Sequence, residues 1–240
     1  MNINWADYFR LSRTAWYSLV FILPLVAVYE VLAVMINWES ALQLRNGADV
    51  LLRQLLAIFG LSAPHVLAGL LACAVAGAWL WQRKVHSTSR VAGAHLAVML
   101  VESVLWAGFL LVSLSTADQL LLTTASNSVL RTAFLAVGAG IYEEGVFRLA
   151  LITPLAAFFL MAMDWRRPVA WGLAVFTAAV LFSLFHYVGP GGETFGWNSF
   201  GYRCVAGVIL GLLFVYRGFG ITVYAHTVYD LLVLGMLTVR

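Results

Sequence analysis

Seven stretches of the chain are long and apolar enough to cross a lipid bilayer, and they leave few residues for any other structure. A transmembrane helix needs about 20 mostly apolar residues. Because lipid offers no hydrogen-bond partners to the backbone, each stretch is expected to be a helix. We therefore predict an all-α fold, a polytopic helical membrane protein of about seven transmembrane helices (six to eight). The predicted spans are residues 15–36, 64–82, 91–114, 128–150, 168–188, 200–216 and 219–238.

The composition favours lipid over water as the solvent. Apolar residues make up 62% of the chain and charged residues 10%, whereas a soluble domain carries about 25% charged residues. The lipid bilayer is therefore an expected partner. The net charge is only +3 and is spread over the loop ends, which indicates no nucleic-acid partner.

Two segments depart from the simple pattern of spans. Residues 47–60 carry apolar side chains at helical spacing, with Asp49 and Arg53 on other faces, which predicts an amphipathic helix in the membrane interface. Residues 151–163 are apolar and contain Pro154. They either extend the fourth span after a kink or form a separate short helix, and the sequence leaves both alternatives open.

Basic residues predict the topology, since cytoplasmic loops carry an excess of lysine and arginine. In a seven-span arrangement most of them fall on one side, which predicts a cytoplasmic N-terminus and an external C-terminus. These residues are Arg10, Arg13, Arg83, Lys84, Arg90, Arg166, Arg167 and Arg217. Within one span, Gly207 and Gly211 form a pair of small residues that favours a close helix contact.

Ionisable residues inside the apolar stretches are the feature most informative about function. A charge at the bilayer centre costs at least about 2.5 kcal/mol, so such residues usually face a cavity or a charged partner. Glu30 and Glu102 are expected to pair with arginines or to line a cavity. The others are Glu143, Glu144, Arg148, His186, His226 and Asp230.

The fourth span contains a pair of glutamates and an arginine. On a helix Glu144 and Arg148 are four residues apart, so they meet on one face and can form an ion pair. Glu143 points about 100° away and has no local partner. A lone carboxylate in a low-dielectric cavity can serve as a general base. The alternative is a buried ion pair beside one spare protonated acid.

Two later spans carry histidines. His186 closes the fifth span, and a single histidine there can equally be a satisfied core residue. His226 and Asp230 are four residues apart in the last span, so Asp230 can hold the imidazole tautomer, unless the two form only a structural polar pair. Separate burial of these groups in three places would be costly. One shared polar cavity is favoured, which predicts an active site.

Together these residues resemble the three motifs of the CAAX-protease and bacteriocin-processing family, which includes the type II CAAX prenyl endopeptidases. The resemblance covers about residues 128–240. The motifs are Glu143-Glu144-x-x-x-Arg148, Phe182-x-x-x-His186 and His226-x-x-x-Asp230. We therefore expect two parts: residues 1–127, membrane helices with the interfacial helix at 47–60, and residues 128–240, a catalytic membrane core.

The resemblance implies an intramembrane glutamate-type endopeptidase. It implies that Glu143 and His186 activate a water, that His226 and residue 230 stabilise the oxyanion, and that the remaining pair, Glu144 and Arg148, is structural. The third motif of the family often ends in asparagine. Ionised Asp230 can only accept hydrogen bonds, and it could donate to the oxyanion only if it were protonated, which a buried site permits. We expect it to orient His226 instead.

No cofactor is expected. A zinc or iron site at Glu143, His186 and His226, with Asp230 as a fourth ligand, is the less favoured alternative, because no compact ligand signature is present. The expected partner is a peptide or protein substrate, lipid-modified or bearing a C-terminal sorting tag. The expected location is the bacterial cytoplasmic (inner) membrane, as an integral multi-pass protein.

Two other classes of function compete with the protease. One is a non-enzymatic membrane partner or immunity protein for a secreted peptide, since an intact motif does not prove turnover. The other is a proton-coupled transporter that relays protons through intramembrane carboxylates. Transporters of that type are commonly built from repeats with paired broken helices, and this sequence shows no such repeat, so we rank the transporter last.

Overall fold

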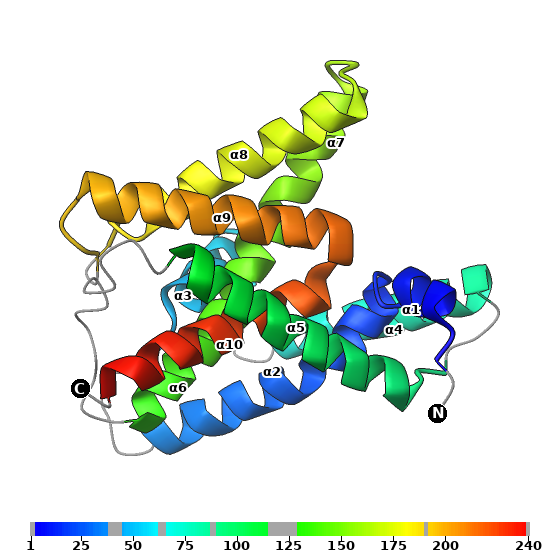
Figure 1. Cartoon of the computed structure of the whole chain (residues 1–240), viewed down its shortest axis with the longest axis horizontal. Helices are drawn as coiled ribbons and strands as arrows, with labels where there is room; N and C mark the ends of the chain where they lie inside the picture. The colour runs from blue at the N-terminus through cyan, green and yellow to red at the C-terminus, as the bar shows by residue number, and fades with distance from the viewer. Residues whose placement is uncertain are drawn as a thin grey trace.

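The computed structural model describes residues 3–37, 45–61, 66–86, 90–114, 129–189 and 192–238, without the side chains of 37, 67, 86 and 234–238. Every regular element in these ranges is a helix (Figure 1). The helices are α1 (Trp5–Leu11), α2 (Ala15–Asn37), α3 (Gly47–Ile58), α4 (Val66–His86), α5 (Gly93–Leu114), α6 (Val129–Gly138), η2 (Ala139–Glu143), η3 (Gly145–Ile152), α7 (Thr153–Met161), α8 (Arg167–Phe185), α9 (Trp197–Arg217) and α10 (Phe219–Thr238).

Each of the seven predicted spans lies on a helix, although residues 91–92 and 186–188 fall just outside α5 and α8, and residues 64, 65 and 128 lie outside the described ranges. Within the described residues, five helical segments are long and apolar enough to cross a membrane: Ala15–Ile36, Gly93–Leu114, Val129–Met161, Arg167–Phe185 and Trp197–Arg217. The other two predicted spans are α4 and α10, and the part of α10 from Phe219 to Val233 is a shorter apolar helix. The protein is therefore a polytopic helical membrane protein, as predicted.

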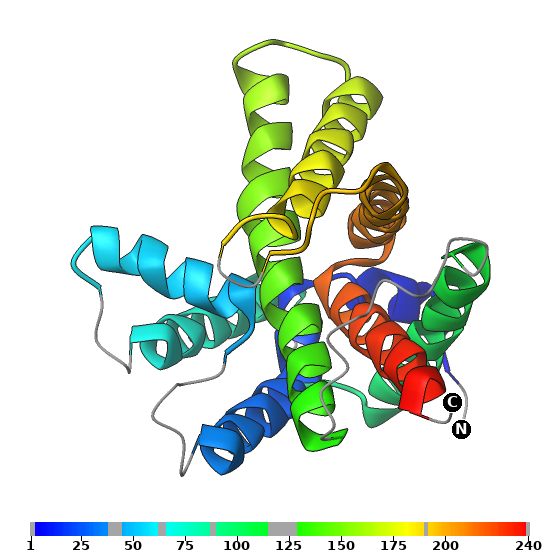
Figure 2. The same cartoon turned by 90° about the vertical axis from the view of Figure 1, so that its left-hand side faces the viewer.

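One helical segment runs unbroken from Val129 to Met161 through α6, η2, η3 and α7, and it passes through the whole height of the molecule in Figure 2. Residues 151–163 thus extend the fourth predicted span. Pro154 is the second residue of α7, where the segment changes from π-helical to α-helical. The middle of the segment, η2 and η3, is π-helical, where the sequence predicted regular α-helix. Such wide turns are rare and occur mostly at functional sites.

The expected helix at 47–60 is present as α3, but its polar side faces the bundle. Asp49 is fully buried. Its exposed side chains are mostly apolar, and the most exposed of them lie at the far end of the helix, where Ile58 is 77% and Phe59 is 78% exposed. A helix that turns its charged side inward and its apolar side outward is suited to lipid contact. Its position in the interface stays a prediction.

The two glutamates outside the motifs are paired with arginines. Glu102 receives two contacts from Arg217, at 2.5 Å from Nε and 2.8 Å from Nη2, and one from the Tyr8 hydroxyl. Burial, reinforced by the neighbouring Glu102, raises the pKa of the Tyr8 hydroxyl well above its usual value. Glu30 lies 3.9 Å from Nη1 of Arg45. The expectation of arginine partners for these two acids is confirmed.

Small residues permit the close helix contacts of the core. Cβ atoms added at Gly207 and Gly211 would lie 2.9 Å from the Cα of Ala179 and 2.8 Å from a methyl group of Val175 on α8. This confirms the predicted close contact. From the first of the two expected parts, α2, α3 and α5 pack against η2 or α10 of the second.

Gly140 sets the distance between η2 and α10. A Cβ atom there would lie 1.9 Å from Oγ1 of Thr227 and 2.9 Å from the carbonyl oxygen of Val223. The backbone oxygen cannot rotate away, so Gly140→Ala is expected to destabilise the protein by about 1–3 kcal/mol. Thermal unfolding in detergent measures this. Gly145→Ala is the control, because nothing lies within 4 Å of that position. Equal unfolding temperatures for both variants would contradict the prediction.

Candidate active site

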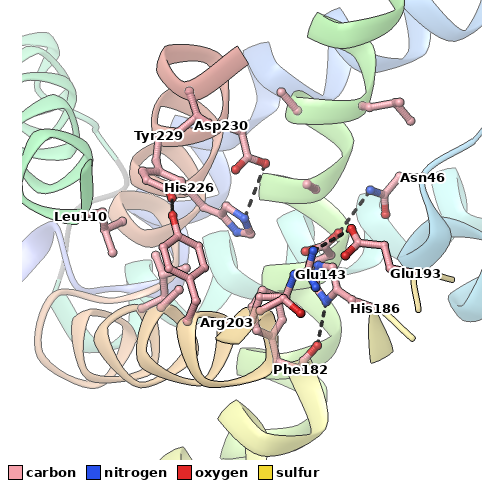
Figure 3. A pocket seen from close by; sticks show the side chains of 18 of the residues that line it. Asn46, Leu110, Glu143, Phe182, His186, Glu193, Arg203, His226, Tyr229 and Asp230 are labelled. Atoms are coloured by element: carbon pink, nitrogen blue, oxygen red, sulfur yellow. Dashed lines mark hydrogen bonds and ion pairs between the residues drawn. The ribbon is translucent and has the colours of Figure 1, made fainter. Parts of the chain in front are cut away.

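The four candidate catalytic residues line one cavity of about 310 Å³ (Figure 3). They come from three separate segments of the chain: Glu143 from η2, His186 from the end of α8, and His226 and Asp230 from α10. Glu143 and His226 are buried, with exposed fractions of 7% and 5%. The structure therefore brings together side chains that are up to 87 positions apart in sequence, between Glu143 and Asp230.

The two adjacent glutamates of the first motif point in different directions. Glu143 lines the cavity, whereas Glu144 is fully buried and forms an ion pair of 2.9 Å between its Oε2 and Nε of Arg148. The guanidinium of Arg148 also lies 4.9 Å from the centre of the Phe182 ring, a cation–π distance. The expected pair is therefore present, and neither of its members lines the cavity.

His226 is held by Glu144 on one side and faces Asp230 on the other. Its Nδ1 lies 2.7 Å from Oε1 of Glu144, and its Nε2 lies 3.6 Å from Oδ2 of Asp230. From the sequence alone, Asp230 is expected to orient His226. In the structure Glu144 makes the shorter contact, because the close approach at Gly140 brings α10 against η2. Glu144 thus has two roles: it balances the charge of Arg148, and it fixes the orientation of the His226 ring.

The tautomer of His226 follows from these contacts. If Glu144 is ionised it can only accept, so Nδ1 carries a proton and donates. Nε2 then faces Asp230 and the cavity. A neutral ring could only accept there, whereas a doubly protonated ring donates from both nitrogens. The doubly protonated ring is the form able to donate to an oxyanion from Nε2 while Nδ1 is bound to Glu144.

His186 has one ring nitrogen fixed by its own helix. The residue caps the C-terminus of α8, and its Nδ1 lies 2.9 Å from the carbonyl oxygen of Phe182. A carbonyl oxygen only accepts, so Nδ1 donates and the neutral ring keeps a lone pair on Nε2. The four-residue spacing of the second motif thus has a local reason. It leaves Nε2 able to accept a proton or a hydrogen bond from a water molecule.

The comparison with known families agrees with this geometry. Residues 124–232 match the model of the type II CAAX prenyl endopeptidase Rce1-like family. These residues are an Rce1-like domain. The match contains all three motifs, so the family resemblance drawn from them is confirmed. No curated protein and no solved structure matched the chain. Because the Rce1-like family is a family of membrane proteases, the match supports hydrolase activity and an integral membrane location in general.

The cavity of the Rce1-like domain has further polar lining residues that belong to none of the three motifs. Arg203 donates to Oε1 of Glu193 at 2.7 Å, and the hydroxyl groups of Tyr202 and Tyr229 are in contact. Their positions near the predicted histidine motifs were the only sequence signal available. The lining also includes a residue from outside the Rce1-like domain, Asn46, and no local pattern connects it to the motifs.

A metal centre was the less favoured alternative for the same residues. Within the part of the chain that the structure describes, no three His, Cys, Asp or Glu side chains are grouped so that they could hold one metal ion. As they are arranged in the described structure, no three of Glu143, His186, His226 and Asp230 are grouped so that they could bind one metal ion.

Proposed function

We propose that the protein is an intramembrane glutamate-type endopeptidase, in which Glu143 and His186 activate the attacking water. The observation that carries the proposal is the arrangement of these two side chains. They reach one buried cavity from different helices, and His186 keeps Nε2 available because Nδ1 is bound to the carbonyl of Phe182. A carboxylate and an imidazole acceptor on one water molecule make a general-base pair.

In the proposed reaction Glu143 takes a proton from water while His186 accepts a hydrogen bond from the second water proton. The water oxygen attacks the carbonyl carbon of the scissile peptide bond. His226 donates from Nε2 to the developing oxyanion, an interaction typically worth a few kcal/mol. The proton on Glu143 then passes to the departing amide nitrogen, and the carbon–nitrogen bond breaks to give a carboxylic acid and an amine. Asp230 balances the charge on His226.

We propose a substrate that is a membrane-associated or C-terminally tagged protein or peptide, lipid-modified in some cases, in the bacterial cytoplasmic membrane. A cavity of about 310 Å³ is at the small end of the range for ligand sites. It suits a short extended segment rather than a folded domain. The apolar helices that surround the cavity favour a substrate held at the membrane.

The test is a comparison of protein termini in cells. Membrane proteins from the wild-type strain, a deletion strain and a strain that carries Glu143→Gln are compared by terminal-peptide mass spectrometry. We expect some cleaved termini to be absent from the deletion strain. These termini should return when the wild-type gene is restored, and they should stay absent when the strain carries Glu143→Gln. If the variant restores the wild-type phenotype and termini, the protein acts as a non-enzymatic membrane partner or immunity protein and the proposal is wrong.

We also propose that the reaction needs no metal. The activity of purified protein is expected to stay within about 2-fold of its starting value after treatment with EDTA or 1,10-phenanthroline, because general-base catalysis by Glu143 and His186 requires only protein groups. Hydrolysis of a confirmed substrate measures this. A loss that added Zn²⁺ reverses would favour a catalytic metal.

A further inference from the structure

Asn46 makes a contact to Glu143 that no motif contains. The residue precedes α3 and lies 97 positions before Glu143, outside the Rce1-like domain. Its Nδ2 donates to Oε1 of Glu143 at 3.3 Å, as Figure 3 shows. Its Oδ1 accepts from the backbone N–H of Ala48 at 2.8 Å, which caps α3. Both ends of the amide are used, and this fixes its orientation.

A buried network holds the start of α3 in place. Asp49 is fully buried, and its carboxylate accepts from the Tyr29 hydroxyl at 3.0 Å, from Arg45 at 2.8 Å and from Arg53 at 2.7 Å. The Tyr29 oxygen in turn accepts from the backbone N–H of Asn46 at 3.4 Å. Charge-assisted hydrogen bonds of this kind are strong. Asn46 is therefore held by a connected set of contacts to α2 and α3.

The contact between α3 and the glutamate-bearing segment is also tight. A Cβ atom at Gly138 would lie 2.9 Å from Cβ of Asn46 and 2.7 Å from the Tyr29 ring. Only a residue without a side chain allows this approach, one turn before Glu143. The amide of Asn46, which is 7% exposed, is thereby brought to the cavity wall.

We propose that Asn46 is a positioning residue for Glu143, so that the site needs a part of the chain outside the Rce1-like domain. The inference rests on the proposed function. Because Nδ2 binds Oε1, the other carboxylate oxygen, Oε2, is left to meet the water.

The charge of the surroundings explains why a neutral donor suits this position. An N–H donor stabilises the ionised carboxylate that a general base requires. The charged and titratable groups near Glu143 include its neighbour Glu144, Arg148 on η3, His186 at the end of α8, and His226 and Asp230 on α10. Glu193 and Arg203 line the same cavity. An amide fixes the direction of the carboxylate without changing the charge of this set.

The experiment compares two substitutions that both keep the helix cap. Serine and aspartate are as good as asparagine at the N-cap position, so both variants should preserve α3. Asn46→Ser should also keep the unfolding temperature, whereas Asn46→Asp should lower it, because a second carboxylate is then buried beside Glu143. Serine is too short to reach Glu143, and aspartate brings a carboxylate against it. We expect kcat to fall about 10-fold in the serine variant and about 100-fold in the aspartate variant, the range for groups that orient a functional residue. KM should stay within about 2-fold.

Gln54→Asp is the matched control, because it places a negative charge on an exposed position of α3 and is expected to leave kcat unchanged. The proposal is overturned if both Asn46 variants keep wild-type kcat, or if kcat and unfolding temperature fall together in both, since Asn46 would then only cap the helix. Full activity of Glu143→Gln would instead overturn the proposed function. If Glu143→Gln loses activity while both Asn46 variants keep the wild-type kcat, the role of Asn46 is overturned and the proposed function stands.

Discussion

Replacing Glu143 with glutamine is expected to lower kcat for peptide hydrolysis by about 10²–10⁴-fold, the contribution typical of a general base. Glutamine has nearly the same shape but cannot take a proton from water at neutral pH. The contacts that build the core, from Glu144 to Arg148 and His226, stay intact in this variant. Purified protein in detergent or nanodiscs and a labelled substrate measure the rate, and an unchanged unfolding temperature shows that the fold is preserved.

The double variant Glu143→Gln with His186→Ala sharpens this prediction. If the two residues act on the same water, the second substitution should cost little after the first, because groups that act as a unit are strongly non-additive. His186→Ala alone is expected to cost nearly as much as Glu143→Gln alone. Two independent losses that multiply in the double variant would mean that the residues serve different steps.

The sequence was sufficient for the membrane-spanning helices and for the four candidate catalytic residues of the cavity, because both carry local signals. A span is defined by about 20 apolar residues in a row, and the motifs of Glu143, His186 and His226 are defined by spacing along one helix. The fixed Nδ1 of His186 is an example, since its acceptor is only four residues away.

The sequence could not predict contacts that depend on how helices pack. The partner of His226 Nδ1 is Glu144 and not Asp230, because Gly140 lets α10 approach a π-helical segment that no propensity scale predicts. The inward-facing Asp49 of α3 is a second case. In the sequence, Asp49 and Arg53 have the pattern of a polar helix face turned toward water. In the structure α3 packs against η2, and Asp49 accepts a hydrogen bond from Tyr29 of α2, so the polar face holds the helix to the bundle.

The second large effect is expected at Arg148. Arg148→Met removes the positive partner of Glu144, where the side chains of the pair are only 1% and 0% exposed. An uncompensated buried carboxylate typically costs about 3–5 kcal/mol, so the unfolding temperature should fall sharply. Arg10→Met is the control. Its ion pair with Asp7 has a similar length, 2.7 Å, but its side chains are 61% and 42% exposed, and such pairs contribute about 0–1 kcal/mol.

Adding Glu144→Gln to Arg148→Met separates the stability of the fold from catalysis. The double variant contains no lone buried charge, so it should recover much of the stability that the single variant lost. The glutamine amide oxygen can still accept the hydrogen bond from Nδ1 of His226, but it no longer supports a positive charge on the ring. Hydrolysis should therefore stay slow although the protein is stable. A double variant that unfolds as early as Arg148→Met would show instead that Arg148 stabilises the fold through its contact with the Phe182 ring and not through its charge.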